Sequence, residues 1–195
     1  EIMNDDGSMA RLPDLVDFAQ RHRLKIGTIS DLIRYRRRHD NLIVERSQRQ
    51  VHSAFGGDWT MRVFADQTQG TEHIVLTKGD VTGDQPVLVR MHALDPLHDV
   101  LGVGREASGS VGAAMKAIAE EGRGAVVLIR DLTHAIVDAT EAGPHTLRQY
   151  GLGAQILSAL GLSQLILLTN SAPVKVVGLD AYGLSIHSTR PIPKD

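Results

Sequence analysis

The stretch from Arg90 to Ser110 concentrates side chains that could do chemistry. It holds two histidines, three acidic residues and a glycine-rich turn, in the sequence RMHALDPLHDVLGVGREASGS. Histidine and carboxylate side chains are common metal ligands, and a glycine-rich turn ahead of a helix is typical of a phosphate site. Two histidines without further ligands are nonetheless more often hydrogen-bonded or exposed than bound to a metal. Residue types and spacing alone therefore leave the nature of this stretch open.

A second polar group, LLTNSAPVK, ends an apolar run at Leu167–Lys175. Open α/β sheets bind ligands at the carboxyl ends of their strands, which is where Thr169 and Asn170 would stand. With Lys175 six residues beyond Thr169, the loop fits a phosphate cradle and a polar turn between two elements equally well. The sequence GRGAVV is a weaker candidate for a phosphate loop, because Gly122 most simply closes the preceding helix.

The elements that would position these residues follow from hydrophobic patterning. Four strands are predicted from Leu42 to His92, in NLIVERSQ, TMRVFAD, EHIVLTKGD and QPVLVRMH, and they suggest a mainly antiparallel half-sheet. Beyond Ser110, predicted helices alternate with predicted strands, as in βαβ units of a partly parallel sheet. Nearer the N-terminus, apolar residues at helical spacing predict helices over 15–18 and 26–35, the second capped by a threonine or serine ahead of Asp31. The pattern indicates one α/β domain with a mixed sheet.

Composition excludes several classes of function. The formal net charge of −2 gives no electrostatic reason to expect nucleic acid or an anionic membrane as a partner. The basic run RYRRRHDN, Arg34–Asn41, is better explained as a solvated helix end than as a nucleic-acid patch. The sequence contains no cysteine, which removes disulfides, thiolate metal sites and cysteine nucleophiles. No apolar run is long enough for a membrane span or signal core, so we expect a cytoplasmic protein.

Five motifs, taken together and in order, resemble the GTP cyclohydrolase II family of riboflavin biosynthesis. They are EHIVLTKGD, VLVRMH, YGLGAQILSALG, LLTNSAPVK and GLDAYGLSI, and the resemblance covers about residues 42–193. The opening 36 residues, EIMNDDGSMARLPDLVDFAQRHRLKIGTISDLIRYR, resemble the end of a 3,4-dihydroxy-2-butanone 4-phosphate synthase domain running into the linker of fused, bifunctional proteins. Glu1 would match an active-site glutamate of that synthase. We predict a synthase tail and linker over 1–41 and a GTP cyclohydrolase II-like domain over 42–195.

The resemblance implies a layered α/β/α fold with a mixed sheet, a dimer, and an activity that opens the imidazole ring of GTP. In the family, zinc held by three cysteines activates the attacking water. In this sequence, the positions of the three cysteines are occupied by Asp95, Glu106 and Ser108. Two carboxylates and a hydroxyl could hold a hard ion such as magnesium loosely, but thiolates select zinc. We therefore predict that the domain has lost its zinc and contains no metal, with magnesium expected only in the synthase part.

Two further departures from the family pattern affect the chemistry. Leu132 and His134 stand where the family carries glutamate and arginine, in a loop that is about a dozen residues short. Thr146 replaces an aspartate, so the family's catalytic arginine, Arg148, is predicted to be vestigial. The positions that resemble phosphate and ribose contacts of GTP are retained, namely Arg90, Thr169 and Lys175.

The sequence therefore predicts a degenerate GTP cyclohydrolase II-like domain of a riboflavin-biosynthesis protein, without ring-opening activity. It would serve the synthase part of the same polypeptide through assembly or regulation, as a homodimer, and could bind GTP or another nucleotide. The alternative is a divergent enzyme that has exchanged zinc for a carboxylate-bound metal and acts on GTP or a related purine nucleotide. An unrelated α/β binding module is a third, weaker alternative.

Overall fold

The computed structural model describes residues 2–32, 35, 43–103, 110–130, 144–170 and 179–193, with the backbone alone for residues 98 and 144–150. The helices are α1 (Leu12–His22), α3 (Pro96–Asp99), α4 (Ser110–Glu121) and α5 (Pro144–Ala159), with a 3-10 turn η1 (Leu179–Tyr182). The strands are β1 (Ile43–Ser53), β2 (Gly57–Asp66), β3 (Thr71–Lys78), β4 (Val87–Ala93), β5 (Gly124–Ile129), β6 (Gln164–Leu168) and β7 (Ser185–Arg190).

The strands form one mixed sheet in the order β1-β2-β3-β5-β4-β6-β7. The side from β1 to β5 is antiparallel, and the side from β5 through β4 and β6 to β7 is parallel. Short turns connect β1 to β2 and β2 to β3, and Gly56 and Gly57 supply the positive φ angles that the first turn requires. The predicted mixed sheet with an antiparallel half is confirmed, although β4, the fourth predicted strand, belongs to the parallel side.

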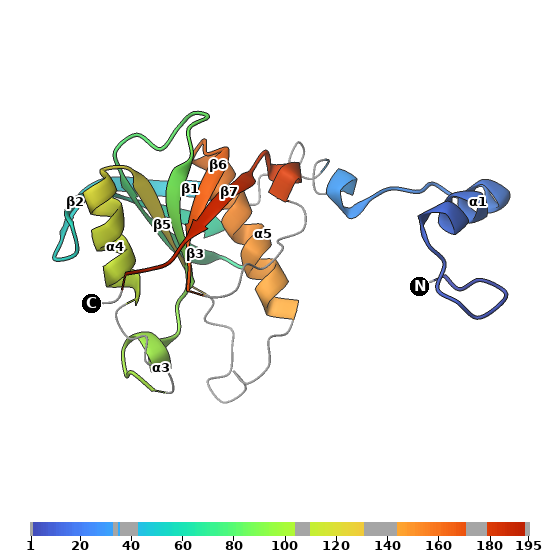
Figure 1. The fold of residues 1–195 in the computed structure, drawn as a ribbon, viewed down its shortest axis with the longest axis horizontal. Coiled ribbons are helices and arrows are strands. Elements are labelled where there is room, and N and C mark those ends of the chain that lie inside the picture. The colour runs from blue at the N-terminus through green and yellow to red at the C-terminus, as the bar shows by residue number, and fades with distance from the viewer. Residues whose placement is uncertain are drawn as a thin grey trace.

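Helices cover both faces of the sheet (Figure 1). Along β4, Val87 and Val89 pack into the core under α5, whereas Leu88 between them packs with α4. In β5, Val126 likewise packs with α4, whereas the residues on either side of it pack into the core under α5. Burial on both faces explains why the central strands are almost continuously apolar in sequence. The predicted α/β/α layering is confirmed.

Two glycines fix the junction between α4 and β5. Gly122 has φ of 75° and donates its N–H to the carbonyls of Ile118 and Ala119, so it closes the helix as predicted. At Gly124, an added Cβ would lie 2.6 Å from Ile118 Cγ2 and 2.7 Å from the carbonyl oxygen of Leu88. Only glycine therefore lets α4 pack this closely onto the sheet.

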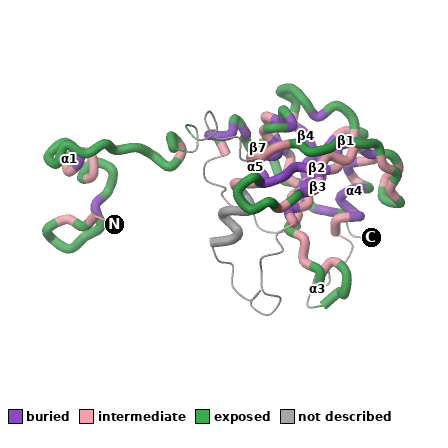
Figure 2. The backbone as a smooth tube through the Cα atoms, turned by 180° about the vertical axis from the view of Figure 1, so that it is seen from behind, coloured by how far each residue is buried: buried purple, intermediate pink, exposed green. Residues whose placement is uncertain are grey.

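The N-terminal segment, residues 2–35, lies apart from the sheet in both views, and most of it is exposed (Figures 1 and 2). Helix α1 contains the predicted helical stretch at 15–18. Of the helix predicted at 26–35, residues 26–28 are not helical, and the helix starts at Ile29. Thr28 explains this start, because its Oγ1 accepts the N–H of Asp31 at 3.0 Å, as a helix cap does.

Parts of the predicted organisation lie outside the described residues. The basic run is described only at Tyr35, which is exposed, and the predicted boundary between residues 41 and 42 is not tested. Within the described part of the chain, no helix combines the length and apolar character that crossing a membrane would need.

Candidate functional site

The candidate site lies where the parallel strands β4 and β6 end side by side. Val89 pairs with Leu167, so the next residues along each strand, Arg90 and Leu168, are also neighbours. Arg90 Nη1 donates a hydrogen bond of 3.2 Å to the Leu168 carbonyl. Because Thr169 follows Leu168 directly, the structure brings the backbone of two predicted site residues, Arg90 and Thr169, to the same edge of the sheet.

Arg90 continues into a chain of polar contacts. Its Nη2 lies 3.2 Å from His92 Nδ1, and His92 Nε2 lies 2.8 Å from Asp99 Oδ2. Since a guanidinium can only donate, the contact assigns His92 Nδ1 as the acceptor and leaves Nε2 to face the Asp99 carboxylate. The His92 and Asp99 side chains are only 12% and 19% exposed. Of the two histidines singled out in the sequence, His92 is thus hydrogen-bonded within the protein.

Burial lowers the pKa of the Arg90 guanidinium, and the nearby carboxylate of Asp99 opposes that shift. The side chain still carries its charge at neutral pH, because an arginine pKa starts above about 12. Arg90 Nε is buried and has no hydrogen-bond partner among the described residues. A half-buried cation at the carboxyl ends of parallel strands is suited to binding an anion.

Asp95 has a structural role that its position in the sequence pattern did not predict. Its Oδ1 accepts the N–H of Leu97 at 3.0 Å, which makes Asp95 the N-cap of the short helix α3, with Pro96 at the first helical position. Its own backbone N–H donates to Asp99 Oδ2 at 2.8 Å. The dipeptide Asp-Pro was the signal that could have predicted this cap. Arg90, His92, Asp95 and Asp99 are called the Arg90 cluster below.

These donors do not fit a thiolate zinc site. Asp95, at one of the cysteine positions, already uses a carboxylate oxygen as a helix cap, and the charged guanidinium of Arg90 lies three contacts away, through Asp99 and His92. Within the described residues, no group of three histidine, cysteine, aspartate or glutamate side chains is placed to hold a metal ion. The other two cysteine positions, Glu106 and Ser108, lie outside the described residues.

The loop after β6 is only partly described. Asn170 Oδ1 accepts the N–H of Ile192 at 2.8 Å, and the Thr169 N–H donates to the Arg190 carbonyl at 3.0 Å. Asn170 therefore holds the C-terminal segment in place, which is a structural role. Lys175 lies outside the described residues, so the predicted cradle stays a prediction.

Arg148 and Thr146 belong to α5, of which this part is described by its backbone only. The helix packs closely onto β4, since a Cβ at Gly153 would lie 2.1 Å from Met91 Cε. Met91 and Arg90 are adjacent in β4 and point to opposite faces of the sheet. The structure thus places the α5 backbone and the Arg90 side chain on different faces. Glu1, Leu132 and His134 lie outside the described residues.

Comparison with known proteins identifies the family. The model of GTP cyclohydrolase II matches residues 45–191, and that of 3,4-dihydroxy-2-butanone 4-phosphate synthase matches residues 1–35. The first match covers well over half of the chain, so the protein belongs to the GTP cyclohydrolase II family. The resemblance drawn from the sequence motifs is confirmed.

Its relatives are longer proteins. The chain is 39% identical to the riboflavin biosynthesis protein RibBA of Synechocystis, over 98% of this chain and 38% of the relative. It is 38% identical to a 3,4-dihydroxy-2-butanone 4-phosphate synthase of Pseudomonas syringae, over 99% of this chain and 56% of the relative. A similar solved structure is RibBX, described as a two-domain 3,4-dihydroxy-2-butanone 4-phosphate synthase from A. baumannii. It matches with a TM-score of 0.59 and 28% identity, over 100% of this chain and 53% of that chain. The chain thus spans about half or less of the length of these relatives.

Proposed function

We propose that this domain is a degenerate GTP cyclohydrolase II-like part of a riboflavin-biosynthesis protein, which binds no zinc and opens no GTP ring. It serves a 3,4-dihydroxy-2-butanone 4-phosphate synthase part of the same polypeptide through assembly or regulation, as a homodimer. The observation that carries the proposal is the absence of cysteine from the sequence, together with the use of Asp95 as a helix cap.

The chemistry of ring opening supports this reading. In the family, zinc supplies the nucleophile by lowering the pKa of a bound water toward about 7. Without thiolate ligands this chain has no comparable source of hydroxide among its described residues. Arg148 cannot replace it, because a guanidinium stays protonated and is a poor nucleophile. The aspartate that the family carries two residues before this arginine is Thr146 in this sequence.

The names of the relatives point the same way. Two relatives from Pseudomonas, matched over 95% or more of this chain, are named only as synthases, and the A. baumannii structure is described as a two-domain synthase. Other relatives of similar identity are named as RibBA proteins. A GTP cyclohydrolase II-like domain therefore occurs in proteins that are named for the synthase activity alone.

Anion binding is the function that the Arg90 cluster retains in this proposal. The half-buried positive charge of Arg90 favours a phosphate group, with Thr169 and Lys175 as further contacts to GTP or another nucleotide. The same charge disfavours the alternative, a carboxylate-bound metal acting on a purine nucleotide, because a divalent cation near His92 would face the guanidinium that contacts the same ring.

Two measurements test the proposal. Metal analysis of the purified chain is expected to find no stoichiometric zinc or other metal. Incubation with GTP and either zinc or magnesium is expected to release no formate above background, with an active GTP cyclohydrolase II run in parallel as the positive control. Formate release that falls on Arg148→Ala would instead establish the divergent enzyme.

Nucleotide binding is measured separately, by titrating the chain with GTP and with inorganic phosphate. Arg90→Ala is expected to abolish binding and Arg123→Ala to leave it unchanged, because Arg123 bonds to the carbonyls of Asp80 and Thr82, away from the Arg90 cluster. Equal binding by both variants would contradict the assigned phosphate contact.

A further inference from the structure

The antiparallel side of the sheet carries apolar side chains that belong to neither core cluster. Met61 and Val63 of β2 and Ile74 of β3 are half-buried, and none of the three packs into the cluster under α4 or the cluster under α5. Val63 pairs with Ile74, and Met61 lies two residues before Val63 in the same strand, so the three side chains are neighbours on the sheet. They are called the β2–β3 patch below.

The β2–β3 patch lies on the face of the sheet that carries α4. Met61 pairs with Leu76, Leu76 pairs with Val126, and Val126 belongs to the core cluster under α4. Paired residues of neighbouring strands point to the same face, and so does every second residue along a strand. Because α4 packs mainly on β4 and β5, it leaves this part of the face to one side.

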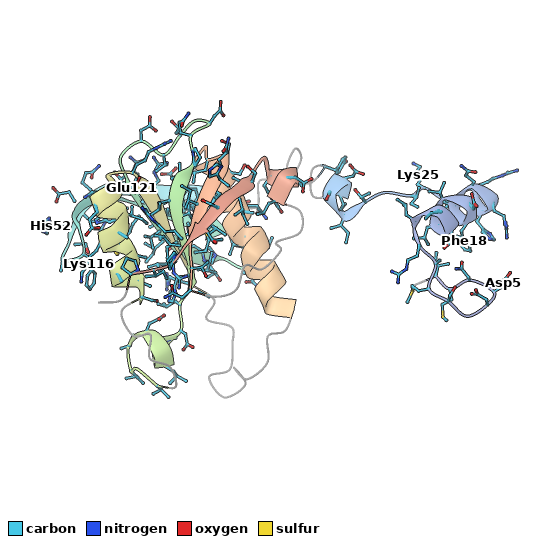
Figure 3. The ribbon with its side chains drawn as sticks, viewed as in Figure 1. Asp5, Phe18, Lys25, His52, Lys116 and Glu121 are labelled. Atoms are coloured by element: carbon cyan, nitrogen blue, oxygen red, sulfur yellow. The ribbon has the colours of Figure 1, made fainter. Side chains whose placement is uncertain are left out.

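The N-terminal segment does not cover the patch either. Figure 3 shows Phe18 and Lys25 of that segment far from His52, which belongs to β1 at the border of this face. Neither α4 nor the N-terminal segment therefore buries the patch. Half-buried apolar side chains on such a face are suited to packing against a second sheet.

Two exposed charges of opposite sign flank the patch. Arg49 of β1 pairs with Met61, and Glu72 lies two residues before Ile74 in β3, so both point to the face of the patch. Among the described residues, neither side chain forms an ion pair. Arg130 approaches Glu72 through its backbone carbonyl, at 3.4 Å, and not through the carboxylate.

The positions of these two charges are self-complementary. Val63 lies midway between them in the sheet. Arg49 is on the strand to one side, opposite Met61, which is two residues before Val63. Glu72 is on the strand to the other side, opposite Ala65, which is two residues after Val63. A two-fold axis that crosses Val63 perpendicular to the line from Arg49 to Glu72 exchanges the two positions, so that two copies packed face to face bring Arg49 of each against Glu72 of the other.

We propose that the β2–β3 patch is the contact surface of a homodimer, with a second copy of this chain as its occupant. Val63 packs against its own counterpart at the centre, and two symmetric ion pairs between Arg49 and Glu72 flank it. Three apolar side chains from each copy make a small interface, and exposed ion pairs orient partners more than they add affinity. We therefore expect a weak dimer that added salt weakens further. The inference rests on the proposed function, because it locates the homodimer contact proposed there.

Charge reversal tests the ion pairs, with sedimentation velocity of the full chain at micromolar concentration as the measurement. Arg49→Glu and Glu72→Arg are each expected to weaken the dimer by about tenfold, because each places like charges opposite one another. The double variant Arg49→Glu/Glu72→Arg restores both pairs and should dimerise within about threefold of the parent chain. The matched control is Arg46→Glu, at the exposed bulge of the same strand, which should change nothing.

Cross-linking tests the position of the axis independently. The chain contains no cysteine, so Val63→Cys introduces a single thiol, which lies beside its own copy in the proposed dimer. Mild oxidation is expected to convert this variant into a disulfide-linked dimer. Ile186→Cys is the matched control on β7, at the opposite edge of the sheet, and should stay unlinked. Equal cross-linking of the two variants, or none with Val63→Cys, would overturn the assigned axis.

The outcomes separate this surface from the rest of the proposed function. A dimer that resists both single reversals, or a double variant no better than the single ones, would overturn the surface and leave the proposed homodimer in place. A chain that stays monomeric would overturn both. Neither measurement depends on metal content or on formate release, so a failure of the proposed loss of catalysis is seen separately, in those assays.

Discussion

The N-terminal segment and the sheet domain use the same local devices with different results. Asp6 accepts both the hydroxyl and the N–H of Ser8, and Asp80 accepts both groups of Thr82 in the same way. Each region also contains a helix with a defined end, α1 in one and α4 in the other. Yet α4 buries five residues, whereas α1 buries only Ala19. Local hydrogen bonds thus define the backbone in both regions, but only burial makes a region stable by itself.

Truncating one leucine in each region gives the largest expected contrast. Leu165 is 1% exposed in the core under α5, and Leu12 is 65% exposed on α1. Leu165→Ala is expected to lower the free energy of unfolding of the sheet domain by about 2–5 kcal/mol, because it leaves a cavity. Leu12→Ala should change it by less than about 0.5 kcal/mol. Urea unfolding followed by tryptophan fluorescence measures both, since Trp59 lies in the sheet domain; comparable losses would mean that the two regions unfold together.

A methyl group added to one glycine in each region gives the next contrast. At Gly124 the new Cβ would meet Ile118 and the Leu88 carbonyl at under 3 Å, whereas at Gly27 nothing lies within 4 Å. Gly124→Ala is therefore expected to cost about 1–3 kcal/mol through overpacking between α4 and the sheet. Gly27→Ala should leave the melting temperature of the sheet domain unchanged. A melting curve unaffected by Gly124→Ala would show that α4 can move away at no cost.

The helix caps Asp95 and Thr28 provide a smaller contrast. Asp95→Ala removes the cap of α3 beside the Arg90 cluster and is expected to cost about 1 kcal/mol, or a melting temperature lower by about 2–4 °C. Asp95→Asn keeps an oxygen for the Leu97 N–H and should restore most of this. Thr28→Ala removes a cap in the N-terminal segment and should leave the melting temperature as it is. Unchanged stability of Asp95→Ala would contradict the assignment of Asp95 as a cap.

The smallest expected effect is on the pH dependence of stability. Hydrogen bonds from the hydroxyl and N–H of Thr82 hold the pKa of Asp80 below its ordinary value of 3.8. Because the pKa is lower in the folded state, ionised Asp80 stabilises the fold fully above pH 3.8, and this contribution is lost as the pH falls through the folded pKa. Asp80→Asn should therefore make the acid-induced fall in melting temperature shallower.

Asp6 is the matched control for this titration. Hydrogen bonds from Ser8 lower its pKa in the same manner, but the turn lies in the N-terminal segment. Asp6→Asn is expected to leave the acid dependence of the sheet domain's melting unchanged. Identical shifts for the two variants would show that the comparison between the regions fails.

Local sequence signals predicted much of the fold. Alternating apolar residues marked the strands, Gly122 marked the end of α4, and Thr28 marked the start of a helix, because each of these signals acts over a few residues. The strand order was not predictable in this way. Placing β5 between β3 and β4 depends on packing of both sheet faces, which no local pattern encodes.

The candidate site was predicted in outline only. The sequence brought Arg90 and Thr169 forward as neighbours of one ligand, and the structure brings their backbones together through Leu168. The bond from Asn170 to Ile192 spans 22 residues and could not be predicted from spacing, whereas the Asp95 cap carried a local signal in the following proline. Side chains with a tertiary partner were therefore the ones that the sequence left undecided.

The sheet order also has a kinetic consequence. Strands β1 to β3 join through short turns. Strand β4 instead pairs with β6, which is far away along the chain, as the pairing of Val87 with Leu165 shows. Pairing across so long a separation is slow, because the entropy of closing the intervening chain is lost before any contact compensates for it. The antiparallel side should therefore form first during refolding. Since Arg90 needs the Leu168 carbonyl, its environment is completed only when β6 docks, and a spectroscopic probe placed there would follow the last and slowest phase of folding.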